Sequence, residues 1–101
     1  MALDIHRSDN NEYIFGINDE LYNCLEAIFE QFKYATGFRI DPYGDTKLSI
    51  DNIKLLIKLI DKYIEKTDLN KDKKKTIITL EFRWLLNLLI KHNLPISLYG
   101  D

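Results

Sequence analysis

The fold is decided by the stretch from Lys74 to His92, which reads KKTIITLEFRWLLNLLIKH. Its apolar side chains cover nearly the whole circumference of a helix, and we therefore predict a helix over residues 74–92. A helix that is apolar on almost every side is central and packs against several neighbours. Pro95 prevents its continuation. The apolar positions are Ile77, Ile78, Leu80, Phe82, Trp84, Leu85, Leu86, Leu88, Leu89 and Ile90.

Glu81 stands out within this predicted helix. On a helical wheel it falls among the apolar positions, and an unpaired carboxylate buried there would cost free energy. If the side chain is buried, it should meet Arg39, Arg83, a tyrosine hydroxyl or water. A structural ion pair is favoured over a functional shift of its pKa.

Two amphipathic helices are predicted before the central one. Residues 19–36 place leucine, isoleucine and phenylalanine side chains on one face and acidic side chains on the opposite face, and Gly37 ends this helix. Residues 49–67 begin with Ser49 as an N-cap and cover about half of the helix circumference with isoleucine and leucine.

A short β-hairpin is predicted at the N-terminus. Apolar and polar residues alternate over residues 3–5 and 13–17, and the Asn and Asp residues between them favour a turn. Residues 96–99 either pair as a last strand or lie on the surface. The predicted fold class is therefore mainly α, a single domain over residues 1–101, with three principal helices (about 19–36, 49–67 and 74–92) and a short N-terminal β-hairpin.

The composition is that of an ordinary globular domain. The chain has 101 residues, 46% of them hydrophobic and 30% charged, which suits one core and excludes a disordered chain. Its single cysteine cannot form an internal disulfide. The first residues include acids and lack an apolar segment, and the run from Trp84 to Ile90 is far shorter than the ~20 residues of a membrane span. We expect a cytoplasmic protein with no membrane partner.

Charge is distributed unevenly along the chain. Up to Thr46 there are nine acidic residues against three basic ones, whereas from Lys47 onward basic residues outnumber acidic ones, and the formal net charge is −2. An acid-rich surface attracts basic partners. The lysines at positions 71 and 73–75 could touch phosphate, but Asp68 and Asp72 interrupt them, so a solvated loop is favoured and no direct contact with nucleic acid is expected.

No metal or cofactor motif accompanies these charges. An EF-hand loop that began at Asp41 would need Gly at its sixth position and Glu at its twelfth, whereas Gly44 is fourth and Asn52 is twelfth. Cys24 falls on the apolar face of the first helix, which indicates a core cysteine, and no close His/Cys spacing suits zinc. We expect no metal and no cofactor.

Two histidines are the only residues that suggest catalysis. His6 and His92 lie near opposite ends of the chain, and such a pair could carry out acid–base cleavage of RNA if the folded termini met. Nothing in the sequence orients them toward each other, and His92 equally suits the C-terminal end of a helix. We therefore expect that the protein is not an enzyme.

A partner-binding surface is predicted on the acidic side of the first helix and on the turn that follows it. Asp19, Glu26 and Glu30 line one stripe of this helix. The residues Asp41-Pro42-Tyr43-Gly44 suit a type I turn, and a rigid turn loses little entropy when it docks. Tyr43 would be the aromatic anchor. The predicted partner-binding residues are Asp19, Glu26, Glu30, Asp41, Tyr43 and Asp45.

The segment from Gly37 to Ser49, which leads into an Ile/Leu-rich helix, resembles small bacterial immunity proteins. These proteins are encoded beside polymorphic or contact-dependent growth inhibition toxins. The resemblance covers about Gly37 to Ile64 and rests also on small size and acidic character. It implies one-to-one neutralisation of a cognate toxin domain without catalysis. Because toxins that cut nucleic acid are basic around their active sites, the expected partner is a basic toxin domain of the nuclease class.

Two other functions stay open at this point. A homo-oligomeric adaptor would bury the wide apolar arcs of the second and third helices between subunits, and a homodimer of this kind is also compatible with immunity. A small RNase would use His6 and His92.

Overall fold

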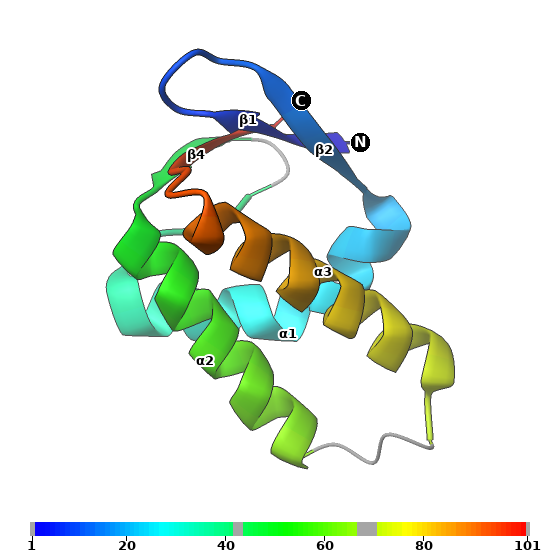
Figure 1. Cartoon of the computed structure of the whole chain (residues 1–101). Coiled ribbons are helices and arrows are strands. Elements are labelled where there is room, and N and C mark those ends of the chain that lie inside the picture. The colour runs from blue at the N-terminus through cyan, green and yellow to red at the C-terminus, as the bar shows by residue number, and fades with distance from the viewer. Residues whose placement is uncertain (1, 42–43, 67–70, 101) are drawn as a thin grey trace.

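Three helices lie against one face of a four-stranded antiparallel sheet (Figure 1). This computed structural model describes residues 2–41, 44–66 and 71–100. Along the chain the elements are β1 (Ala2–Arg7), β2 (Tyr13–Asn18), α1 (Asp19–Thr36), β3 (Asp45–Leu48), α2 (Ile50–Lys66), α3 (Lys73–Lys91) and β4 (Ile96–Gly100).

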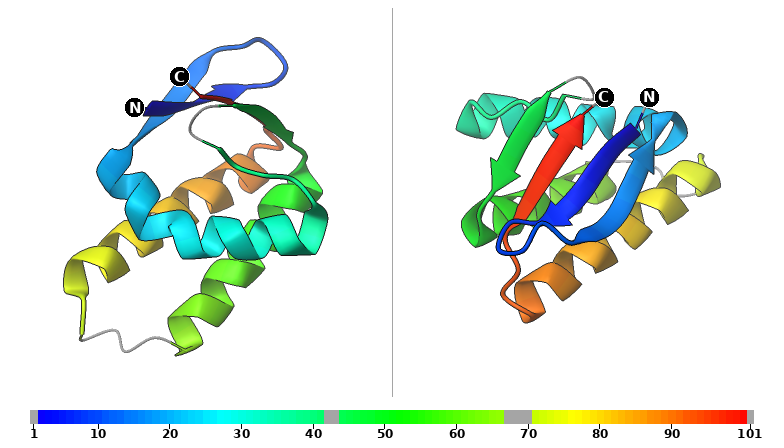
Figure 2. Two further views of the ribbon diagram at one scale, coloured as in Figure 1. Left: turned by 180° about the vertical axis from the view of Figure 1, so that it is seen from behind. Right: turned by 90° about the horizontal axis from the view of Figure 1, so that it is seen from above.

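The two ends of the chain form the middle of the sheet. The strand order is β2-β1-β4-β3, so β1 and β4 are adjacent although they open and close the chain (Figure 2). Leu3 is opposite Ile17 in β2, and Ile5 is opposite Leu98 in β4. These four side chains are at most 3% exposed and face the helices. The other face of the sheet, which carries His6 and Tyr99, has no helix over it (Figure 1).

The core lies between the sheet and the helices. Each helix contributes one apolar face, and the fully buried side chains include Leu25, Phe32, Ile53, Ile60 and Leu86. Burying a side chain of this size stabilises the fold by about 1.5–3 kcal/mol. Within the described residues, the core is continuous from α1 to the sheet.

Local signals fix the ends of α1. The side-chain oxygen of Asn18 accepts a hydrogen bond from the Leu21 amide over 2.9 Å, which caps the first turn. At the other end Gly37 has φ +80°, and its amide donates to the carbonyl oxygen of Lys33 over 2.7 Å. The left-handed conformation costs glycine little, so the helix ends there.

The predicted helices are confirmed, but the predicted fold class is only partly right. The N-terminal hairpin is present, yet it belongs to a four-stranded sheet, so the fold is mixed α and β rather than mainly α. The sequence left residues 96–99 open between a strand and a surface segment, and it predicted no element at residues 45–48, which form β3. These short strands form because β4 pairs with both β1 and β3, which are distant in the sequence.

The interpretation of residues 74–92 as a helix buried on several sides is wrong. α3 buries Thr79, Phe82, Leu86 and Leu89, while Ile77, Leu80 and Trp84 are 56%, 46% and 64% exposed. The helix lies at the edge of the helical layer, and its N-terminal half extends away from the sheet (Figure 1). A helix in that position has neighbours on one side only.

The exposure of Glu81 has the same cause, the position of α3 at the edge of the helical layer. Its side chain is exposed on the outer side of α3 and takes no part in an ion pair within the described residues. Arg83, one of its expected partners, instead donates from Nε to Oδ1 of Asp61 over 2.7 Å, which ties α3 to α2. The buried structural pair considered for Glu81 is therefore absent.

Candidate functional site

Carboxylates from α1 and from the segment after it gather around the phenol of Tyr22. Glu26 and Glu30 follow Tyr22 by one and two helical turns and are exposed. The Tyr22 hydroxyl is half-buried and donates to the carbonyl oxygen of Ile40 over 3.1 Å, which brings Asp41 beside the helix. Burial raises the pKa of Tyr22, and the negative charges of Glu26, Asp41 and Glu30 raise it further. We call Glu26, Glu30 and Asp41 the acidic face.

Basic groups offset part of this charge. Nε of Arg39 lies 3.7 Å from Oδ2 of Asp41, and the positive charge of Arg39 lowers the pKa of Tyr22. Lys33 is exposed one turn after Glu30 on the same side of α1. Within the described part of the chain, Glu26 and Glu30 take part in no ion pair. The negative field of the acidic face therefore centres on these two side chains.

An exposed aromatic side chain adjoins the acidic face. Tyr34 follows Glu30 by one helical turn and is 80% exposed, and Phe38, just beyond the end of α1, is 48% exposed. The sequence reasoning missed Tyr34. Its spacing of four and eight residues from Glu30 and Glu26 would have found it. The aromatic anchor predicted instead, Tyr43, lies outside the described residues.

The remaining predicted residues do not join this group. Asp19 begins α1, two turns before Glu26 on the same stripe, and its neighbour Glu20 forms a salt bridge with Lys74 of α3. Asp45 begins β3 opposite Tyr99, and its Oδ1 accepts from the Gly100 amide over 3.3 Å. Asp45 therefore belongs to the sheet, and no described contact links it to α1.

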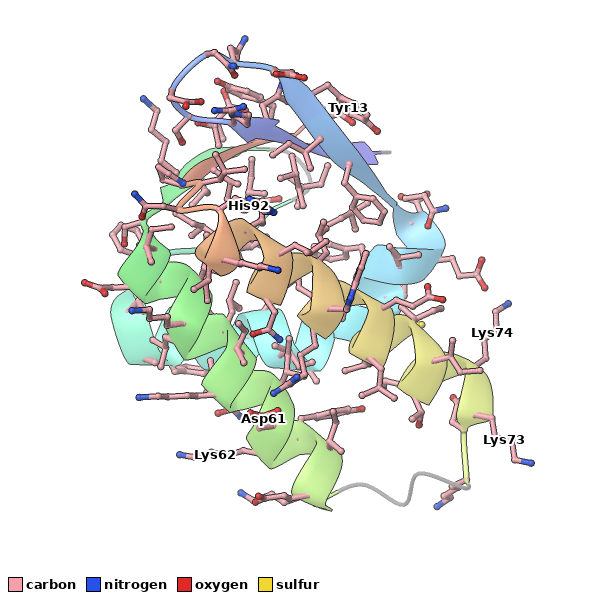
Figure 3. The ribbon with its side chains drawn as sticks, viewed as in Figure 1. Tyr13, Asp61, Lys62, Lys73, Lys74 and His92 are labelled. Atoms are coloured by element: carbon pink, nitrogen blue, oxygen red, sulfur yellow. The ribbon has the colours of Figure 1, made fainter. Side chains whose placement is uncertain are left out.

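The two histidines are held by separate neighbours. His6 Nδ1 lies 2.9 Å from the carbonyl oxygen of Asn11, and its ring packs edge-on against Tyr13 and Tyr99, with centroids 5.5 and 5.0 Å away. His92 instead terminates α3, beneath the sheet, whereas Tyr13 lies on β2 (Figure 3). No described contact brings the two imidazoles together as an acid–base pair.

No ligand set for a metal is found in the described ranges, where no three His, Cys, Asp or Glu side chains are grouped suitably. Cys24, expected in the core, is half-buried on α1. Among the described helices, none has the length and apolarity needed to cross a membrane.

Comparison with known proteins gives no relative. No family model, no curated protein and no solved structure matches this chain. The function must therefore be argued from the surface itself.

Proposed function

We propose that this chain is a non-catalytic binding protein that neutralises a basic toxin domain, in the manner of an immunity protein, by docking the acidic face and Tyr34 against it. The observation that carries the proposal is the combination of Glu26 and Glu30, which lack ion-pair partners in the described residues, with Tyr34 at 80% exposure on the same helix. Tyrosine is enriched at protein-binding surfaces, and carboxylates without a cation attract a positively charged partner.

The rigidity of this surface favours binding. Glu26, Glu30 and Tyr34 are spaced one turn apart on an 18-residue helix that is capped at both ends. Little backbone entropy is lost when a pre-formed helix docks, so more of the contact energy appears as affinity. Tyr34 would supply contact area, and the two carboxylates would speed encounter with a positively charged partner and select for it.

A nuclease domain is the partner class that this chemistry fits. A protein that cleaves nucleic acid needs a positive surface to hold the phosphate backbone. An acidic inhibitor that covers such a surface blocks substrate access without any catalysis of its own. No cofactor is needed for this role.

The test is to sequence the neighbouring genes for a large secreted protein and to use its C-terminal domain in a pull-down with this chain. We expect a one-to-one complex at about 0.05 M salt that weakens at about 0.5 M salt, because salt screens exposed charges. The absence of such a complex, or of such a neighbour, would count against the proposal.

A triple variant locates the interface. Glu26→Gln, Glu30→Gln and Tyr34→Ala together should raise the Kd for the toxin domain by at least about a hundredfold, since interface anchors commonly contribute 2 kcal/mol or more. Glu65→Gln on α2, also an exposed glutamate, is the matched control and should leave the Kd unchanged. Equal affinities of the triple variant and the control would place the interface elsewhere.

The RNase alternative has a direct test of its own. If the purified chain degrades RNA, and His6→Ala or His92→Ala abolishes the degradation, catalysis replaces inhibition as the function. We expect no RNA cleavage by the chain or by either variant.

A further inference from the structure

A groove lies where β2, α1 and α3 meet. Phe15 of β2, Leu21 of α1 and Phe82 of α3 line it, together with Glu81, Trp84 and Leu85, and it has a volume of about 340 Å³. The segments that form it lie side by side in Figure 1, where β2 leads directly into α1 and α3 passes their junction. A groove of this size accepts one or two apolar side chains.

Exposed apolar side chains extend the groove along α3. Ile77, Leu80 and Trp84 follow one another at spacings of three and four residues and are 56%, 46% and 64% exposed. They therefore form one stripe on the helix. We call this stripe, together with Glu81, the α3 patch. A contiguous apolar surface at the rim of a groove is typical of a site that another molecule covers.

Glu81 gives the α3 patch a charge. Its exposed carboxylate lies beside Ile77 on the helical wheel, between the stripe and the groove residue Leu85, and no described base pairs with it. The nearby bases of α3 are engaged elsewhere, since Lys74 pairs with Glu20 and Arg83 with Asp61. A carboxylate surrounded by apolar groups and left without a cation is complementary to a positively charged group that arrives with apolar neighbours.

Trp84 makes arginine the best-fitting cation. It follows Glu81 by three residues, so its indole and the carboxylate lie on the same side of the helix. A guanidinium can stack on an indole face while its N–H groups donate to a carboxylate, which an ammonium group does less well. Tryptophan and arginine are also the residues that most often dominate binding energy at interfaces.

A second copy of this chain fits the surface less well. In a two-fold dimer the same surface meets itself, and Glu81, which lies between the stripe and the groove, would come close to Glu81 of the other copy. Two like charges brought together in an apolar interface repel each other. The charge pattern therefore selects a different, basic molecule.

We infer that the groove and the α3 patch bind a basic amphipathic helix of a partner protein, with an apolar side chain in the groove and an arginine between Trp84 and Glu81. Recognition of this kind places an apolar helix face against a hydrophobic groove. The surface is formed by α3, β2 and Leu21 at the start of α1 and does not include the acidic face, so the inference does not depend on the toxin-binding proposal.

Peptide binding at this site can be measured by the fluorescence of the chain itself. Trp84 is its single tryptophan, so tryptophan fluorescence reports on the α3 patch alone. The probe is a synthetic amphipathic helix of leucine, alanine and arginine that contains no tryptophan or tyrosine. Titrating the full chain with this peptide should shift the Trp84 emission to shorter wavelength and saturate. A scrambled peptide of the same composition, and a peptide with glutamate in place of arginine, should give no shift.

Charge reversal tests the role of Glu81. Glu81→Lys should raise the Kd of the arginine peptide by at least about tenfold, because it places a cation against a cation. Glu65→Lys, an exposed glutamate of α2, is the matched control and should leave the Kd unchanged. Glu26→Gln with Glu30→Gln should also leave it unchanged, so that failure at this site is distinguishable from failure of the toxin-binding proposal.

Three results would overturn the inference. The first is no emission shift with the arginine peptide, and the second is an equal shift with the glutamate peptide or an unchanged Kd in Glu81→Lys. The third is a shift that appears on concentrating the chain without peptide, which would show that a second copy covers the α3 patch.

Discussion

The hydroxyl of Tyr22 donates a hydrogen bond to the carbonyl oxygen of Ile40 over 3.1 Å. Ile40 is only 3% exposed, so its side chain anchors the segment after α1 in the core while its carbonyl is held by the helix. The next residue is Asp41. This contact therefore helps to hold the Asp41 carboxylate close enough to Tyr22 to raise the pKa of its phenol, as Glu26 does from α1.

Replacing Tyr22 with phenylalanine should lower the free energy of unfolding by about 1 kcal/mol, because a partly buried carbonyl loses its partner. Urea denaturation measures the change. Tyr34→Phe is the matched control: Tyr34 is 80% exposed, and removing its hydroxyl should change stability by less than about 0.5 kcal/mol. Equal effects of the two variants would show that the Tyr22 hydroxyl does not hold the segment.

Alkaline pH should destabilise the fold partly through Tyr22. Burial and the charges of Glu26 and Asp41 raise the pKa of Tyr22 above its usual 10.0, so the folded chain keeps this proton at a pH where the unfolded chain has lost it. Stability therefore falls as pH rises wherever the folded state binds more protons. The contribution is intact below about pH 10 and is lost as the pH rises through the folded-state pKa.

Tyr22→Phe isolates this effect. The unfolding free energy of the variant should fall less steeply above about pH 10 than that of the parent chain, as measured by urea denaturation across the alkaline range. Ultraviolet titration of the tyrosines should also lose its late-ionising component. Identical slopes for the variant and the parent would contradict the raised pKa.

The helices could be predicted from sequence because their signals are local. Asn18 caps α1, Gly37 ends it, and Ser49 with Asn52 exchange hydrogen bonds at the start of α2, the Asn52 amide to Ser49 Oγ over 3.2 Å. β3 could not be predicted, because four residues show too little alternation and its partner β4 lies about fifty residues away. Whether so short a segment forms a strand depends on its hydrogen bonds to a distant partner strand.

The part of the candidate site that lies on one helix could be predicted from sequence, whereas the parts that depend on long-range contacts could not. The stripe of Glu26 and Glu30 follows from helical spacing alone. The approach of Asp41 depends on the Tyr22–Ile40 hydrogen bond, and the separation of Asp45 depends on the pairing of β3, neither of which the sequence displays. Hydrophobicity likewise suggested that Trp84 is buried, whereas the position of α3 at the edge of the layer leaves it exposed.

Two leucines of α3 test the orientation of that helix. Leu86 is fully buried, and Leu86→Ala should lower the free energy of unfolding by about 2–5 kcal/mol through lost burial and an added cavity. Leu80 is 46% exposed, and Leu80→Ala should cost less than about 1 kcal/mol. Urea denaturation compares the same chemical change on the same helix. A larger loss for Leu80 would mean that α3 is rotated from the described orientation.

Alanine substitutions at two glycines between α1 and β3 distinguish the cost of a strained backbone from the effect of an added side-chain contact. Gly37 has φ +80°, and alanine in that conformation costs about 1–2 kcal/mol, so Gly37→Ala should lower the unfolding free energy by that amount. A Cβ on Gly44 would lie 3.8 Å from Cβ of Asp41, an ordinary contact, and Gly44→Ala should change stability by less than about 0.5 kcal/mol. Both are measured by urea denaturation. A loss confined to Gly37→Ala would support the left-handed cap that ends α1, because only this glycine has a positive φ, whereas equal losses would contradict it.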